Sequence, residues 1–190
     1  MNFSDFVEYE ITSYLEHTGL YELFSAEFKW GFCPLLIYLL FVNLAYKNED
    51  NSELFSIVVK ETEIELSSKS LWKTLHIPYH GLTLNEILMD DEEILSRFYL
   101  PSQKPNMANN KLKPIPRLIG RILAYNICPK MGSFNYFSHD LAACVYAIMA
   151  KLEFNLAKIF FDTLAREHIS LPYEAYLTHI FKKFKLDLAS

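Results

Sequence analysis

Apolar positions recur at helical spacing within the first twenty residues of the chain. The apolar members are Phe6, Val7, Ile11, Tyr14 and Leu15. Side chains three and four positions apart share one face of an α-helix, so such a face can pack against a core. Ser4 precedes the run as an N-cap, and Gly19 follows it as a stop. The pattern predicts an amphipathic helix between Ser4 and Gly19.

A longer apolar run follows, with no charged residue over the 17 positions from Trp30 to Tyr46. Pro34 lies inside it, and proline is tolerated in the first turn of a helix. A helix from Pro34 to Tyr46 would be about 20 Å long, whereas the hydrocarbon core of a bilayer is about 30 Å thick. The run therefore predicts the central helix of a protein core, wrapped on all sides by its own chain, and disfavours a membrane span.

The pattern changes to strict alternation after a polar turn at residues 47–53. Residues 54–66 are rich in β-branched side chains, and Thr62, Ile64 and Leu66 alternate with glutamates. A period of two is typical of a strand with one buried face. We expect a β-hairpin that turns near residues 60–62.

Helices with clear start signals fill most of the remaining chain. The predicted helices begin near Ser67 or Ser68, near Asp90, at Pro116, after Ser138, after Asn155 and at Pro172. Small polar residues at N-caps and proline in the first turn are typical of helix starts. The four acids at 90–93 suit the positive end of a helix dipole better than they suit a metal site.

These elements predict a mainly α-helical fold: a compact multi-helix domain with one small β-hairpin. We expect residues 1–190 to form a single domain, with a proline-rich loop at about 101–116 between two halves of opposite charge. Residues 1–100 hold 6 Lys and Arg against 17 Asp and Glu, and residues 101–190 hold 12 against 6. The halves can attract each other when packed, or the basic one can face an anionic partner.

Composition narrows the class of protein. In 190 residues, 51% are hydrophobic and 15% aromatic, which is ample material for a core. The acidic N-terminal residues lack the pattern of a secretory signal, so we expect an intracellular location, with nucleus and cytoplasm not distinguished. Cys33, Cys128 and Cys144 are odd in number and lie in apolar contexts, which predicts reduced, buried thiols.

Motifs for catalysis are weak, so we expect a non-enzymatic protein without catalytic, cofactor-binding or metal-binding residues and without a small-molecule substrate. The one compact triad-like sequence, Ser138-His139-Asp140, is better explained as a helix cap. His76 and His80 are separated by Pro78, which spoils the helical face that a zinc pair needs. The five glycines form no phosphate-binding loop.

Basic residues in two segments, 104–130 and 182–185, supply an alternative function, nucleic-acid binding. The candidate residues are Lys111, Lys113, Arg117, Arg121, Lys130, Lys182, Lys183 and Lys185. If they form one surface, they can hold phosphates. Against this function, the aromatic residues nearby fit a core better than a stacking platform, and the pI is about 5.7.

Four segments resemble, in order, a family of plant mobile-element-derived domains, the plant transposon protein domain. They are "LLFVNLAYK", "VVKETEIELSSKSLWKTLHIPYHG", "RLIGRILAYNICPKMGSFNYFSHDLAACVYAIMAKLEFNLAKIFFDTL" and "LPYEAYLTHIFKKFKLDL". The resemblance spans roughly residues 20–188. The chain departs from the family at Glu174, where glycine is usual, and at Leu186, where valine is usual.

The resemblance implies descent from plant mobile elements, retrotransposons among them, and implies no transposase reaction. A transposase of the type that uses separated acids and two metals needs a larger sheet than one hairpin. We therefore expect a non-catalytic interaction or assembly module, whose partner is another protein or a second copy of the chain.

Overall fold

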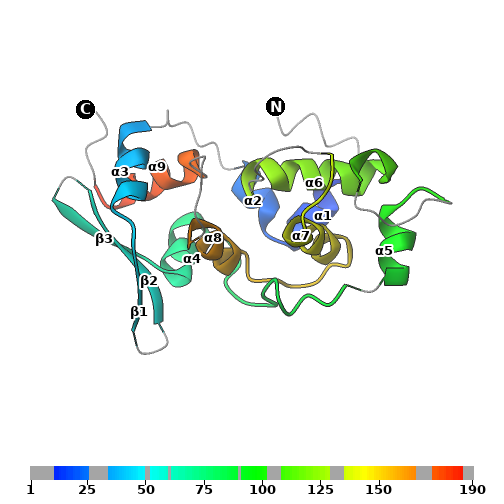
Figure 1. Cartoon of the computed structure of the whole chain (residues 1–190), viewed down its shortest axis with the longest axis horizontal. Coiled ribbons are helices and arrows are strands. Elements are labelled where there is room, and N and C mark those ends of the chain that lie inside the picture. The colour runs from blue at the N-terminus through cyan, green and yellow to red at the C-terminus, as the bar shows by residue number, and fades with distance from the viewer. Residues whose placement is uncertain are drawn as a thin grey trace.

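The computed structural model describes residues 11–25, 34–49, 52–59, 61–89, 91–101, 108–128, 135–165 and 173–185. Within these ranges the chain is mainly helical and contains a small antiparallel sheet (Figure 1). The first half contributes α1 (Ile11–His17), α2 (Leu20–Ser25), α3 (Pro34–Val42), β1 (Ala45–Glu49), β2 (Ser52–Val59), β3 (Thr62–Leu66), α4 (Ser68–Leu75) and α5 (Asp91–Phe98). The second half contributes a 3-10 turn (Asn109–Lys111), α6 (Pro114–Asn126), α7 (His139–Met149), α8 (Leu156–Ala165) and α9 (Glu174–Lys183).

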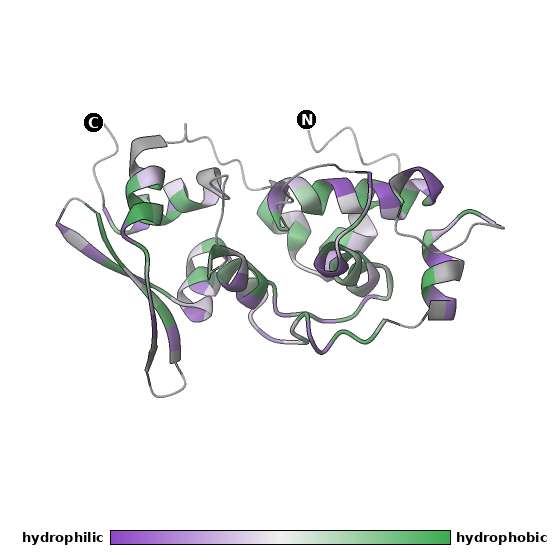
Figure 2. Ribbon diagram, viewed as in Figure 1, coloured by the Kyte–Doolittle hydropathy of each residue, from purple (hydrophilic) through white to green (hydrophobic). Residues whose placement is uncertain are grey.

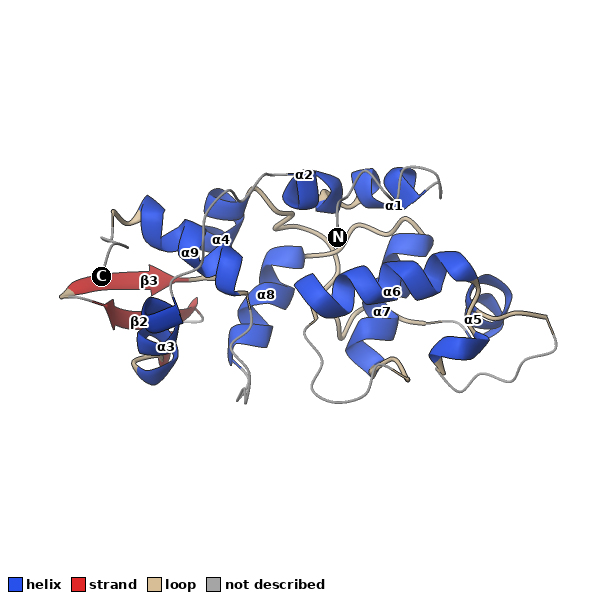
Figure 3. Cartoon of the chain, turned by 90° about the horizontal axis from the view of Figure 1, so that it is seen from above, coloured by secondary structure: helices blue, strands red, loops and turns tan. Residues whose placement is uncertain are grey.

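The elements lie in two groups along the longest axis of the molecule (Figures 1 and 3). One group holds the sheet with α3, α4, α8 and α9, and the other holds α1, α2, α5, α6 and α7. Each group mixes early and late segments of the sequence, because α1 packs against α7 and α4 packs against α8. One cluster of buried hydrophobic residues runs through both groups.

Among the described helices, α7 is the one enclosed on every side. Each residue from Leu141 to Met149 is buried. Three of these residues are alanines, whose small side chains let neighbouring elements approach closely. Cys144 of α7 and Cys128 are buried thiols that form no disulfide, and their Sγ atoms lie 3.5 Å apart. The predicted reduced and buried state is confirmed for both, whereas Cys33 lies outside the described residues.

The apolar helix expected at the centre of the core lies instead at the surface. α3 packs against α9 and β2, and its Ile37 and Leu40 are fully buried. Tyr38 and Val42, which are four residues apart on another face, are 56% and 61% exposed. The prediction that this helix is wrapped on all sides is therefore wrong. An uncharged sequence tolerates burial without requiring it, because apolar atoms make up much of any protein surface.

The same helix also ends earlier than predicted, and a third strand follows it. The Asn43 side-chain amide donates a hydrogen bond to the Leu39 carbonyl oxygen (2.8 Å), and the chain leaves the helix there. The following strand, β1, then pairs antiparallel with β2, from Ala45 opposite Ser56 to Glu49 opposite Ser52. The predicted single hairpin is thus part of a three-stranded sheet in the order β1-β2-β3. Strand pairing with β2 decides the conformation of β1, and helix propensity does not.

The β2–β3 hairpin itself is confirmed. Val59 pairs with Thr62, and Glu61 in the turn has a positive φ of 63°. Ile64 and Leu66 are buried, whereas the intervening glutamates are exposed. In Figure 2, the strands accordingly contain both hydrophobic (green) and hydrophilic (purple) residues. The alternation in the sequence therefore located the buried face of the sheet.

Most helix boundaries follow the predicted capping signals. Ser67 forms a capping box with Ser70, Ser138 accepts a hydrogen bond from the Leu141 amide, and Asn155 accepts one from the Lys158 amide. Gly19 has a positive φ of 68° just after α1. Two further predicted signals, Ser4 and Pro172, lie outside the described residues.

The start of α6 differs from the prediction by two residues. The helix begins at Pro114 and not at Pro116, so that both prolines fall in its first turn, where their missing amide protons cost nothing. Within the predicted proline-rich loop, residues 108–113 form a 3-10 turn and an extended approach to the helix. Residues 102–107 lie outside the described residues.

Candidate functional site

Of the basic residues predicted near α6, two lie on one exposed face of the helix. Arg117 and Arg121 are exposed and lie four residues apart, on the same face of the helix. Hydrophilic and hydrophobic segments accordingly follow one another along α6 in Figure 2. Lys111 and Lys113 are half-buried, and the Lys113 ammonium donates a hydrogen bond to the Ser96 carbonyl oxygen. Lys130 lies outside the described residues.

The basic residues of the last segment lie at the other end of the molecule. Lys183 and Lys185 are exposed at the end of α9, and Lys182 is half-buried. The α9 helix belongs to the group around the sheet, whereas α6 begins at the opposite end, next to α5 (Figures 1 and 3). The structure therefore separates the two predicted basic clusters, and they do not form one surface.

A different helix, α4, supplies basic neighbours for α9. Lys69 and Lys73 are exposed on α4, while Leu71 and Leu75 of the same helix are buried. The two helices pack against each other, and the His179 ring forms a hydrogen bond with the backbone of Thr74. The α4–α9 surface consists of the following exposed and half-buried residues of these two helices and the segments that follow them: Lys69, Trp72, Lys73, His76, Tyr79, Lys182, Lys183 and Lys185.

The pKa of the His179 side chain is lowered by its surroundings at this contact. Burial lowers the pKa of His179, and the nearby charges of Lys183 and His76 lower this pKa further. Lys182 acts in the same direction. Charges from α9 and from the end of α4 therefore act on one ring, at the contact where the two helices pack.

An aromatic side chain, Trp72, lies on the same face of α4 as Lys69 and Lys73. Trp72 is 37% exposed, and its ring stacks on Tyr79 with the centroids 5.6 Å apart and the planes 20° apart. Tyr79 in turn meets the ring of His80 edge-on, with centroids 5.2 Å apart. The surface thus combines a stacked aromatic pair with lysine ammonium groups.

The backbone after α4 creates this stack. His76 adopts the left-handed conformation (φ 55°, ψ 33°), and its amide donates to the Trp72 carbonyl oxygen, which closes the helix. The reversal buries Ile77 and brings Tyr79 back against Trp72. A single left-handed residue therefore brings together two rings that lie seven positions apart in the sequence.

The loop that carries Tyr79 is fixed against the start of α8. The Pro78 carbonyl accepts a hydrogen bond from the Ala157 amide (2.9 Å), and the Leu82 amide donates to the Glu153 carbonyl oxygen (3.0 Å). Between them, Gly81 has φ +102°, and a Cβ there would lie 2.6 Å from the Glu153 backbone. The close approach requires glycine, and it holds the aromatic pair in place.

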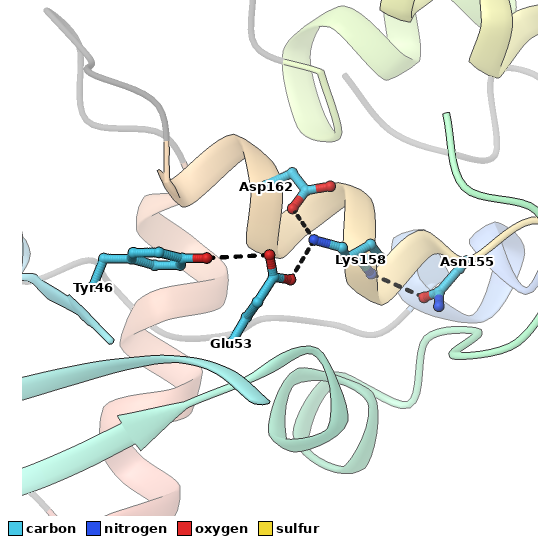
Figure 4. Close-up of polar contacts among 5 residues, drawn as sticks. All are labelled: Tyr46, Glu53, Asn155, Lys158 and Asp162. Atoms are coloured by element: carbon cyan, nitrogen blue, oxygen red, sulfur yellow. Dashed lines mark hydrogen bonds and ion pairs between the residues drawn. The ribbon is translucent and has the colours of Figure 1, made fainter. Parts of the chain in front are cut away.

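A second polar cluster joins the β1–β2 hairpin to α8 (Figure 4). The Lys158 ammonium donates to Glu53 (2.6 Å) and to Asp162 (2.5 Å), and the Tyr46 hydroxyl donates to the other oxygen of Glu53 (3.1 Å). The same ammonium lies 5.5 Å from the centre of the Phe161 ring. Each acid is used in holding the lysine, so this cluster is a structural cross-link.

The pKa shifts of Glu53 and Lys158 favour the charged form of both side chains. The hydrogen bond from Lys158 lowers the pKa of Glu53 below its ordinary value. Burial disfavours the charged form of Lys158, but hydrogen bonds to Asp162 and Glu53 outweigh it and raise the pKa of Lys158. Burial and the Glu53 carboxylate raise the pKa of Tyr46. At neutral pH the ion pairs are therefore fully formed.

The serine of the triad-like sequence forms a helix cap. Ser138 caps α7, and its neighbours His139 and Asp140 lie 3.9 Å apart at the exposed helix start. In the described ranges, no group of three or more His, Cys, Asp or Glu could hold a metal ion. Nor does any helix of these ranges combine the length and apolar character needed to cross a bilayer.

The α4–α9 surface could have been found in part from the sequence. Lys69, Trp72, Lys73 and His76 follow the spacing of one exposed helix face, opposite the buried Leu71 and Leu75. Their meeting with α9 could not be read from the sequence, because it depends on the packing of two helices from opposite halves of the chain. Comparison with known proteins adds nothing to this site: no protein-family model, no curated protein and no solved structure matches the chain.

Proposed function

We propose that this chain is a non-catalytic interaction module of a plant mobile-element-derived protein, and that it associates with a second copy of itself or with another protein. The family origin rests on the order of the four sequence segments described above. The interaction role rests on α3, an uncharged helix whose Tyr38 and Val42 are more than half exposed.

Exposed side chains of this kind favour association. Burying apolar surface contributes about 25 cal/mol per Å², and aromatic residues are enriched at the centres of interfaces. Tyr38 and Val42 share one helix face, and neither side chain has a charged neighbour on α3. A partner that covers this face would bury Tyr38 and Val42, and α3 would then be buried on all sides, as its sequence predicts.

Self-association is tested by the mass of the full chain in solution. We expect light scattering after size exclusion to give a mass above 22.2 kDa that rises with protein concentration. Replacing Tyr38 and Val42 with serine should shift the chain towards the monomer. Tyr125→Ser is the matched control, because Tyr125 is 66% exposed and lies on α6, in the spatial group that does not contain α3. A strict monomer at high concentration would rule out a second copy as the occupant of this face.

Nucleic-acid binding is the second candidate function, and one observation favours it. α9, whose last turn and following residues hold the predicted lysines 182, 183 and 185, packs against α4, which carries the exposed Lys69 and Lys73. Clustered lysines bind phosphates with an affinity that falls steeply with salt. Binding that is absent or indifferent to salt at low ionic strength would remove this candidate.

A further inference from the structure

We infer that the α4–α9 surface binds single-stranded nucleic acid, with a base stacked on the Trp72–Tyr79 pair and the flanking lysines on the phosphates. This inference rests on the second candidate function and adds to it a site and a preference for single strands. Three features of the surface carry it: its charge, its aromatic pair and its rigidity.

The charge of the two helices is one-sided. α4 carries Lys69 and Lys73 and no acid. The only acid in the sequence of α9 is Glu174, its first residue, whereas its lysines lie in the last turn and just beyond. In a chain with a net charge of −5, this concentration of lysines marks a local basic surface. An anionic ligand is the partner that such a surface recognises.

The aromatic pair gives the surface a way to recognise bases. Every base has a π-face, and stacking a base on an aromatic side chain contributes about 1–3 kcal/mol without sequence preference. Trp72 is partly exposed, and the stacked ring of Tyr79 supports it. A duplex hides its bases within the stack, so a site of this kind favours unpaired nucleotides over paired ones.

The rigidity of the site lowers the entropy lost on binding. Tyr79 lies between Pro78, which accepts the Ala157 amide, and Leu82, which pairs with residues at the start of α8. The neighbouring Ile77 is buried. The aromatic pair is thus held before a ligand arrives, and binding need not order a loop.

Fluorescence anisotropy with labelled oligonucleotides tests the site on the full chain. We expect a single-stranded 12-nucleotide oligothymidine to bind more tightly than a 12-base-pair duplex at 50 mM salt. Trp72→Ala should weaken single-strand binding about tenfold, and Trp72→Phe should restore most of it because a ring remains. Replacing Lys69 and Lys73 with glutamine should lower the slope of log affinity against log salt by about 1.4, or 0.7 for each phosphate contact.

Arg117→Gln with Arg121→Gln tests the competing basic surface on α6, in the other spatial group. If the site lies on the α4–α9 surface, this variant should lose less single-strand affinity than the variant that lacks Lys69 and Lys73. Thermal unfolding of each variant shows whether the fold is retained, and the Trp72→Phe variant keeps the test valid if Trp72→Ala is unstable.

The possible outcomes distinguish failure of the proposed binding site from failure of nucleic-acid binding as a function. If the wild-type chain binds neither oligonucleotide, nucleic-acid binding itself fails. If it binds both equally and Trp72→Ala has no effect, the function stands and the stacking site is wrong. The site would also be overturned if replacing Arg117 and Arg121 abolished binding while replacing Lys69 and Lys73 left the affinity unchanged. Polyglutamate that binds as tightly as oligothymidine would identify an acidic protein segment as the occupant.

Discussion

At the scale of single residues, a few backbone conformations determine where functional side chains lie. His76 and Gly81 stand on either side of the loop after α4, and both have positive φ values, 55° and 102°. The first turns the chain out of α4, and the second lets it pass against the Glu153 backbone. Because Tyr79 lies between them, the aromatic stack on Trp72 depends on these two conformations.

Gly81→Ala should be strongly destabilising for this reason. A positive φ strains any residue with a Cβ, and the added carbon would lie 2.6 Å from the Glu153 backbone, which cannot rotate away. We expect the free energy of unfolding to fall by about 3 kcal/mol, measured by urea denaturation. Asn85→Ala, at an exposed position of the same loop, is the matched control and should change stability little. Equal stabilities of the two variants would show that the loop does not need glycine at this position.

At the scale of elements, the sequence predicted each helix whose ends carry local signals. Ser67, Ser138 and Asn155 cap helices where expected, because a cap is a contact within three residues. The sequence analysis missed β1 and the exposed face of α3, because both depend on distant partners. It also missed the six-residue helix α2, which begins directly after Gly19. Residues 45–49 become a strand through pairing with β2, and Tyr38 is exposed because no described element covers its side of α3.

The candidate site shows the same division between local and distant information. The basic character of residues 182–185 and the exposed face of α4 are both visible in the sequence. Lys111, Lys113, Arg117 and Arg121 looked equivalent to the α9 lysines, yet they lie on or just before α6, which belongs to the other spatial group (Figure 3). Composition gives the charges, and only packing decides which of them act together.

The cross-link between the β1–β2 hairpin and α8 should make stability depend on pH. The pKa of Glu53 is lowered in the folded chain, so its contribution is present above the unfolded value of about 4.3 and is lost as pH falls through the lower folded value. Lys158→Met should remove this contribution. Because the side chains of Glu53 and Asp162 are 39% and 38% exposed, solvent screens the pairs, and we expect a cost of about 1 kcal/mol at pH 7.

Urea unfolding at pH 7, 5, 4 and 3 measures this effect. The difference in stability between the wild-type chain and Lys158→Met should shrink as the pH falls below about 4. Glu53→Gln is the companion variant, and its difference from wild type should shrink over the same interval. A difference that stays constant down to pH 3 would show that the cross-link does not contribute through the charge of Glu53.

At the scale of the whole molecule, the two spatial groups do not correspond to the two halves of the sequence. The acidic half supplies α1 to the group around α7, and the basic half supplies α8 and α9 to the group around the sheet. The ion pair between Glu53 and Lys158 joins the two halves directly. Opposite charges in the halves thus serve their packing at this contact.

Fragments cut within the proline-rich loop should therefore be unable to fold separately. A fragment of residues 1–101 would expose the faces of α1 and α4 that pack on α7 and α8, and a fragment of residues 102–190 would expose the complementary faces. We expect each fragment alone to lack cooperative thermal unfolding in circular dichroism, and an equimolar mixture to regain it, because the core contains residues from both. Cooperative unfolding of either fragment alone would mean that the chain contains two independent domains and that its halves need not associate to fold.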